Sequence, residues 1–268
     1  MRAIDESVRA TGLRCWNGHL MRIFDAQSRL EVQERLLAIA RKDERITGSA
    51  LVGSIAGGTE DQWSDIDIAF GVAGGVKLES VLQDMTAALI GDLGAIHHWD
   101  LRSSPAIYRV FLLPDGLEVD IGLWPAAEFG AAGPSFRLVF GDSKQRAPAA
   151  PPDIDDLIGM CWHHALHAHA AIERSRPWQA EHWISALRDN LLGLACIRLE
   201  LPSVHARGTD RLPQVVTAPL ERTLVRSLDT AELRRALREA VNSYMGEVGE
   251  TGPDLAERIE PILRRLQQ

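Results

Sequence analysis

The sequence predicts an α+β protein, in which a small mixed β-sheet with flanking helices is followed by a C-terminal α-helical bundle. Segments with the two-residue period of strands occur only in the first half of the chain, and the second half shows helical periodicity alone. A tract rich in proline and alanine, Arg146–Asp153, separates the two halves and indicates a domain boundary. We therefore expect a sheet domain over residues 1–147 and a helical domain over residues 153–268.

The first half alternates helical and strand signals. Residues 1–30 suggest two short helical segments, and Leu30–Ile46 places apolar residues at helical spacing among charges. The runs that follow predict strands at Thr47–Gly53 and Asp65–Phe70, a helix at Leu78–Leu89, and strands at His97–Leu101, Ile107–Leu113 and Leu117–Leu123. Because Pro114-Asp115-Gly116 is a turn signal, we expect the last two strands to form a hairpin.

The second half carries only helical patterns. We expect helices at Ile154–Arg174, Gln179–Glu200, Leu220–Arg226, Thr230–Met245 and Leu255–Leu266, with a loop over Pro202–Pro219. Asp153 and Thr230 are suitable N-cap residues for two of them.

Composition narrows the class of protein. Of 268 residues, 46% are apolar and 25% charged, which is typical of a globular protein, and no apolar run approaches the roughly 20 residues that cross a membrane. The N-terminus lacks the plan of a signal peptide. Three widely separated cysteines, Cys15, Cys161 and Cys196, argue against a disulfide framework or a zinc cage. We therefore expect a cytoplasmic protein.

The net charge of −8 argues against binding to nucleic acid, which requires a basic surface. It favours a cationic small-molecule partner, although mild acidity also serves solubility alone. Nothing in the sequence indicates the oligomeric state.

The most informative stretch joins a Gly-Ser turn to a pair of carboxylates. Gly53-Ser54 ends the first predicted strand, and Asp65 and Asp67 open the second. Residues i and i+2 of a strand point to the same face, so both carboxylates project together and repel each other unless a cation lies between them. A solvated strand edge is the alternative for an isolated Asp-x-Asp pair.

A third carboxylate makes the pattern specific. Glu118 and Asp120 share one face of the strand Leu117–Leu123, and three or four carboxylates meet if this strand lies beside the one carrying Asp67. All-oxygen ligands suit Mg²⁺, and one or two such ions stabilise the oxygens of an in-line phosphoryl displacement. Glu118 could instead lie exposed at the outer end of its strand.

The run Gly53-Ser54, then Ser64-Asp65-Ile66-Asp67, with a later Val119-Asp120-Ile121, resembles the DNA polymerase β-like nucleotidyltransferase superfamily. The helical second half makes the chain look closest to the nucleotidyltransferases that modify aminoglycoside or lincosamide antibiotics. The motifs cover residues 50–70 and 117–123, and the remaining likeness is architectural.

The resemblance implies a role for each motif residue. Gly53 and Ser54 contact the phosphates of the nucleotide, Asp65 and Asp67 hold one or two Mg²⁺ ions, and Asp120 is the third metal ligand, the base, or both. Many members have an arginine where this chain has Gly57, which removes one phosphate contact. The cations that could replace it are Lys77, Arg102, Arg109 and Lys144.

Three further residue groups fit two interpretations each. His163 and His167 have the i,i+4 spacing of helical zinc ligands but lack the intervening glutamate of a metalloprotease, so they line a cleft or face solvent, where His163 could contact substrate. Arg188 with Asp189 is either a structural ion pair or part of an acceptor site. Tryptophans of the helical half form core or stack on a ligand: Trp162, Trp178 and Trp183.

The sequence thus predicts a magnesium-dependent enzyme that transfers a nucleoside monophosphate, AMP from ATP, to a hydroxyl of a small molecule such as an aminoglycoside or lincosamide, with a role in antibiotic resistance. The helical domain would bind the acceptor. Alternatives are a nucleotidyltransferase of the toxin–antitoxin type, acting on protein or RNA, and a catalytically silent module that binds nucleotide.

Overall fold

The computed structural model describes residues 24–148 and 150–267. The chain divides into two units, residues 1–149 and 150–268, within a few residues of the boundary expected at Arg146–Asp153. Each unit has a hydrophobic core of its own. The two helical segments expected within residues 1–30 lie mostly outside the described residues.

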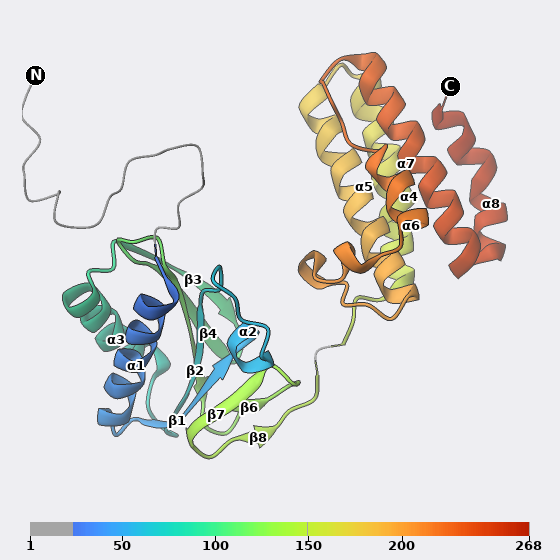
Figure 1. Ribbon diagram of the computed structural model, residues 1–268. Helices are drawn as coiled ribbons and strands as arrows, with labels where there is room; N and C mark the ends of the chain where they lie inside the picture. Colours follow the sequence, from blue (N-terminus) through green and yellow to red (C-terminus); the bar gives the residue numbers. More distant parts are fainter. Residues whose placement is uncertain (1–23, 149, 268) are drawn as a thin grey trace, which may run out of the picture. The chain divides into compact units, whose positions relative to one another are not determined.

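The first unit contains a six-stranded sheet with its two long helices on one face (Figure 1). Its elements are α1 (Ala26–Lys42), β1 (Ile46–Val52), α2 (Gly53–Gly57), β2 (Ile66–Val72), α3 (Leu78–Leu93), β3 (His97–Ser103), β4 (Ala106–Leu112), β5 (Glu118–Pro125), β6 (Gly130–Ala131), β7 (Phe136–Gly141) and β8 (Lys144–Gln145). The strand order is β3-β4-β5-β2-β1-β7, and β6 pairs with β8 separately. β2 and β5 run parallel while their other neighbours run antiparallel, so the expected mixed sheet and the β4–β5 hairpin are confirmed.

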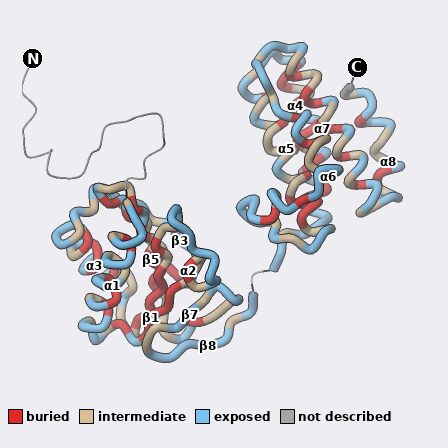
Figure 2. Tube along the Cα trace, in the orientation of Figure 1, coloured by how far each residue is buried: buried red, intermediate tan, exposed pale blue. Residues whose placement is uncertain are grey.

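The two faces of this sheet differ because strand side chains alternate. Ile66, Ile68 and Phe70 of β2 pack with buried residues of α1 and α3, and the alternate residues of the strand face the other way. On that second face Phe129 packs over the backbone of Gly71, where a Cβ atom would lie 3.0 Å from its Cγ. Figure 2 shows the buried residues concentrated along the central strands. The strand pattern therefore buries one face under helices and leaves the second for other contacts.

The second unit is all-helical. It contains α4 (Ile154–Glu173), α5 (Pro177–Arg198), η2 (Val204–Ala206), η3 (Thr209–Arg211), α6 (Gln214–Glu221), α7 (Thr230–Thr251), α8 (Pro253–Leu263) and η4 (Arg264–Gln267). Tyr244 of α7 is fully buried and donates a hydrogen bond to the carbonyl of Ile158 at 3.0 Å, which ties α7 to α4. The α+β class, with a helical C-terminal half, is confirmed.

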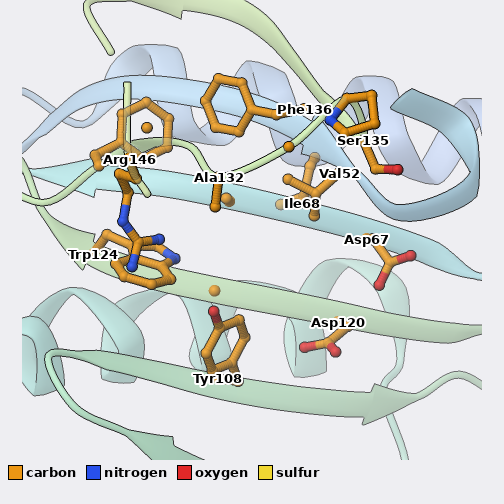
Figure 3. Close-up of a pocket in the computed structure, with 16 residues that line it drawn as sticks. Val52, Asp67, Ile68, Tyr108, Asp120, Trp124, Ala132, Ser135, Phe136 and Arg146 are labelled. Atoms are coloured by element: carbon orange, nitrogen blue, oxygen red, sulfur yellow. The ribbon is translucent and has the colours of Figure 1, made fainter. Parts of the chain in front are cut away.

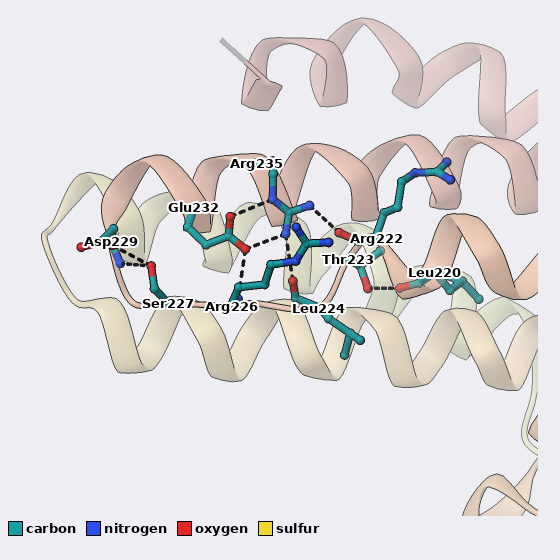
Figure 4. Close-up of polar contacts among 9 residues, drawn as sticks. All are labelled: Leu220, Arg222, Thr223, Leu224, Arg226, Ser227, Asp229, Glu232 and Arg235. Atoms are coloured by element: carbon teal, nitrogen blue, oxygen red, sulfur yellow. Dashed lines mark hydrogen bonds and ion pairs between the residues drawn. The ribbon is translucent and has the colours of Figure 1, made fainter.

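Several predicted boundaries are wrong. The expected helix Leu220–Arg226 is instead α6, which begins at Gln214 within the expected loop, and residues 222–229 form a connection to α7. Polar contacts rather than helical hydrogen bonds hold this connection: the Arg235 guanidinium donates to the carbonyls of Arg222 and Leu224 and to the Glu232 carboxylate (Figure 4). β7 was not predicted, because its edge position leaves Arg137 and Leu138 exposed and weakens the apolar alternation.

The cap assignments are half correct. The Asp153 carboxylate accepts hydrogen bonds from the backbone amides of Asp155 and Asp156, as expected for an N-cap. Thr230 is the first residue of α7 rather than its cap, and Asp229 occupies the N-cap position.

Candidate active site

Asp67 and Asp120 lie opposite each other on adjacent parallel strands. The register pairs Ile66 with Val119 and Asp67 with Asp120. Because their strand neighbours point into the helix-covered core, both carboxylates project from the second face of the sheet, and Figure 3 shows them at one end of a cavity. Neighbouring strands are about 4.8 Å apart, so one small cation can reach both groups.

The other two carboxylates lie at the same end of the sheet. Asp65 immediately precedes β2 and is half-buried, and Glu118 is the exposed first residue of β5. Burial raises the pKa of Asp120 to about 6, and repulsion from Asp65 and from Glu118 adds to the shift. The structure thus brings the other three predicted carboxylates near Asp120: Asp65 and Glu118 are within electrostatic reach of it, and Asp67 lies beside it in the register.

Asp120 has the features of a cation ligand. Its Oδ1 atom is buried and has no hydrogen-bond partner among the described residues. A buried carboxylate without a donor is costly, and a bound cation removes both the missing contact and the repulsion. The site therefore favours a positive charge at Asp120.

The Gly53-Ser54 turn is built against Asp67. Gly53 has a φ of +65°, and a Cβ atom there would lie 1.9 Å from Asp67 Oδ2. Only glycine allows the carboxylate to pack this closely on the backbone. The Ser54 hydroxyl is buried and has no hydrogen-bond partner among residues 24–148 and 150–267. The turn therefore carries an unused buried hydroxyl on the residue that follows the glycine packed against Asp67.

These residues fit a Mg²⁺ ion that is held jointly by the protein and a substrate, rather than one enclosed by protein side chains alone. In the described part of the chain, no three His, Cys, Asp or Glu side chains are gathered closely enough to hold a metal by themselves. Mg²⁺ usually takes one or two carboxylates and completes its shell with water and substrate phosphates. Asp67 and Asp120, with Asp65 beside them, match that requirement.

Arg29 of α1 fixes the loop that leads to Asp65. It is 8% exposed, and its Nη1 donates to the carbonyls of Asp61 and Ser64 at 2.6 and 3.1 Å. The Asp61 carboxylate in turn accepts from the Trp63 amide at 2.7 Å. Sequence reasoning missed Arg29, because nothing in a helical pattern marks which arginine turns inward.

An aromatic cavity of about 330 Å³ extends from the carboxylates along the sheet (Figure 3). Tyr108 and Trp124 meet edge to face with ring centroids 6.0 Å apart, and the Arg146 guanidinium lies 3.9 Å above the Trp124 ring. The sequence offers no signal for this cavity, because Arg146 belongs to the proline- and alanine-rich tract that predicts a linker.

Two of the basic side chains that could replace the missing phosphate contact, those of Arg109 and Arg102, lie away from the cavity. Arg109 lies between Asp100 and Thr86 of α3, at 2.6 and 2.7 Å, and Arg102 pairs with Glu79. Both therefore belong to the helix-covered side of the sheet. Lys77 precedes α3 and Lys144 lies in β8, and neither lines the cavity. At Gly57 a Cβ atom would lie 3.3 Å from Ser135 Oγ, so a side chain there would need the Ser135 hydroxyl to shift by a few tenths of an ångström.

His163 belongs to an aromatic cluster on α4 and α5. Its ring lies 4.3 Å from that of His167, and His164, His167 and His182 each lie within 5.1 Å of Trp183 by ring centroids. His164 is buried, which lowers its pKa, and its Nδ1 is 3.2 Å from Asn190 Nδ2. His163 and Trp183 thus pack against neighbouring rings.

The other residues of the helical unit for which two interpretations were open are the Arg188 and Asp189 pair and two tryptophans. Arg188 donates to Ser185 Oγ at 2.9 Å, and Asp189 is exposed, so the two do not form the buried ion pair that was one interpretation. Trp178 is 74% exposed and Trp162 is partly exposed, so neither is core.

Cys161 and Cys196 are free and buried, and Cys15 lies outside the described residues. None of the helices that the structure describes has the length and apolar character to span a membrane.

Comparison with known proteins gives only distant matches. No family model and no curated protein matches the chain. Among solved structures, it is similar to an aminoglycoside 6-adenyltransferase from Bacillus subtilis, with 18% identity and a TM-score of 0.39 over 88% of this chain and 97% of that one. An adenyltransferase is therefore among the proteins that this chain resembles.

Two further matches are to solved complexes. The GLD-2/RNP-8 complex shares 13% identity with a TM-score of 0.31, over 82% of this chain and 78% of that one. The polymerase core of TRAMP, an RNA surveillance complex, shares 12% identity with a TM-score of 0.28, over 82% of this chain and 59% of that one. TM-scores this low leave the chains too distant to assign an activity.

Proposed function

We propose that this chain is a nucleotidyltransferase that moves a nucleoside monophosphate, AMP from ATP, to a hydroxyl of a small molecule. The observation that carries the proposal is the register of Asp67 with Asp120 on parallel strands, beside the Gly53-Ser54 turn. Paired carboxylates next to a glycine-serine turn suit phosphoryl chemistry, in which positioning and charge stabilisation supply most of the catalysis.

Each residue has a defined task in this proposal. Asp67, Asp120 and Asp65 would hold Mg²⁺, which when bound neutralises charge on the nucleotide phosphates. Gly53 gives the phosphates close access to the backbone, and the buried Ser54 hydroxyl donates to a phosphate oxygen. These contacts orient the α-phosphorus toward Asp120.

The proposed transfer forms one bond to phosphorus and breaks another. The acceptor hydroxyl oxygen forms a bond to the α-phosphorus while the bond from that phosphorus to the bridging oxygen breaks, and pyrophosphate leaves with the electron pair. The hydroxyl proton passes to the Asp120 carboxylate, which acts as the general base. In the metal-free protein, burial and the charges of Asp65 and Glu118 raise the pKa of Asp120 to about 6.

The test is pyrophosphate release. The protein is incubated with Mg²⁺, each of ATP, GTP, CTP and UTP, and a panel of aminoglycosides and lincosamides, the acceptor classes that the motif resemblance implies. We expect Asp67→Asn to abolish release without loss of folding, and the exposed Asp92→Asn on α3 to leave it unchanged. Retained turnover in Asp67→Asn would overturn the mechanism. Binding of ATP without release for any acceptor would instead favour a silent nucleotide-binding module.

A further inference from the structure

The geometry of the transfer sets the side from which the acceptor approaches. In an in-line displacement the attacking and leaving oxygens lie on opposite sides of the phosphorus. The Gly53-Ser54 turn follows β1, which borders β2 on one side, whereas β5 and β4 lie on the other. Pyrophosphate held at the turn therefore leaves toward β1, and the hydroxyl arrives from the β5–β4 side, where Asp120 stands.

One wall of the aromatic cavity, formed by Tyr108, Gly122 and Trp124, lies on that side, and Val52 and Phe136 line the cavity on the β1 side. Tyr108 of β4 pairs with Gly122 of β5, and a Cβ atom on Gly122 would lie 2.9 Å from Tyr108 Cε1, so the ring rests directly on the backbone. Trp124 continues the same face of β5, and Phe129 and Phe136 line the cavity across from it. The walls therefore present apolar ring faces along the approach to Asp120.

Arg146 places a positive charge at the far end. It is half-buried, its guanidinium stacks on Trp124, and among the described residues no carboxylate forms an ion pair with it. By contrast Arg109 and Arg198, which are also partly buried, each pair with a carboxylate at 2.6 Å. Trp124 is four residues beyond Asp120, or about 13 Å along the strand, which is too far for Arg146 to neutralise Asp120. Its charge is therefore available to a ligand.

We infer that this cavity takes the acceptor, and that the acceptor carries an apolar or sugar ring and is neutral or anionic rather than polycationic. The inference rests on the proposed function, because the in-line argument needs the transfer. An anionic group on the acceptor pairs with Arg146, the ring packs on Tyr108 and Trp124, and a hydroxyl about one ring away reaches Asp120. A polycation would instead meet the like charge of Arg146 at the far end of the cavity. This acceptor differs from the cationic one that the net charge favours.

Three probes of one shape test the charge preference: the para-nitrophenyl glycosides of glucuronic acid, glucose and glucosamine, which are anionic, neutral and cationic. Their nitrophenyl group quenches tryptophan fluorescence, so dissociation constants are measured with Mg²⁺ and α,β-methylene-ATP present and again with Mg²⁺ alone. We expect the glucuronide to bind about tenfold more tightly than the glucosaminide, as a partly desolvated ion pair provides.

Variants assign the preference to Arg146. Arg146→Gln should bring the three constants within about threefold of one another, and Arg146→Lys should restore most of the preference. Arg137→Gln makes the same change of net charge on an exposed arginine of β7 outside the cavity lining, and should leave the preference intact. Equal binding of the three probes, binding of none, or an unchanged preference in a folded Arg146→Gln protein would each overturn the inference.

The two proposals fail differently. Discrimination among the glycosides without pyrophosphate release for any nucleotide or acceptor would refute the transfer and leave the charge preference of the cavity standing. Pyrophosphate release with aminoglycosides as the only effective acceptors would refute the inference and leave the transfer standing.

Discussion

A Cβ atom on Gly53 would lie 1.9 Å from Asp67 Oδ2, so the backbone of the Gly53-Ser54 turn packs directly against the Asp67 carboxylate of β2. Twelve residues of chain separate the end of β1 from Asp65, yet the strand pairing of β1 with β2 returns them to the same place. The two halves of the sequence motif are therefore one structural feature.

Gly53→Ala should abolish nucleotide transfer while leaving the sheet folded. The new Cβ atom must displace the Asp67 carboxylate, and a misplacement of about 1 Å in a reacting geometry can cost about 100-fold in rate. Gly58→Ala is the matched control, because Gly58 has a φ of +67° and nothing lies within 4 Å of its Cβ position. Both variants should lose about 1–2 kcal/mol of stability from the left-handed backbone. Equal activity in the two variants would contradict this account.

Asp120→Asn should stabilise the metal-free protein at pH 7. The folded-state pKa of about 6 lies above the ordinary 3.8, so protonated Asp120 stabilises the fold below about pH 4, and this stabilisation is lost as the pH rises through 6. Removing the charge should therefore gain about 1–3 kcal/mol at pH 7 and little at pH 4.

Chemical denaturation of both proteins at pH 4 and pH 7, in a chelator, measures this difference. Saturating Mg²⁺ should narrow the difference in unfolding free energy between the two proteins, because the cation stabilises the wild type alone. A gain in stability that does not depend on pH would point to improved packing instead. The exposed Asp92→Asn on α3 serves as the control for a lost surface charge.

Arg29→Ala should release the loop that precedes Asp65. Two carbonyls, of Asp61 and Ser64, lose their buried donor, and the exposed Arg35 on the same helix provides the control variant. We expect protease cleavage within residues 58–64 in Arg29→Ala only, and a fall in kcat of about tenfold or more with a smaller change in KM for ATP. An intact loop in the variant would show that the hydrogen bonds are dispensable.

Arg235→Ala should destabilise the helical unit far more than Arg234→Ala. Arg235 donates to two carbonyls of the α6–α7 connection and to Glu232 (Figure 4). Arg234 instead makes a surface ion pair with Glu173. We expect losses of about 2 kcal/mol and about 0.5 kcal/mol or less, measured by urea denaturation. Similar losses in the neighbouring variants would argue against a structural role for the connection.

The elements that the sequence predicts well are those whose pattern is local. Alternation in β2 and β5 follows from one face packing under α1 and α3, so the strands and the shared face of Glu118 and Asp120 can be read directly. Edge strands and irregular connections cannot be predicted in this way, because they lack such a local pattern. β7 lacks strong alternation, and the residues 222–229 are ordered by a distant arginine rather than by local preference.

By itself the sequence determined that carboxylates and a Gly-Ser turn occur in the order and spacing of a cation and phosphate site, because strand periodicity fixes which side chains share a face. Only the tertiary structure decided that Asp67 and Asp120 stand in register, since parallel pairing between distant strands has no local signal. It also decided which arginines matter. Arg109 forms an ion pair with Asp100 on the helix-covered side, and Arg29 donates a hydrogen bond to the loop before Asp65. Arg146 stacks on Trp124 in the cavity. Burial and neighbouring charge give these arginines different roles, and both depend on the folded chain.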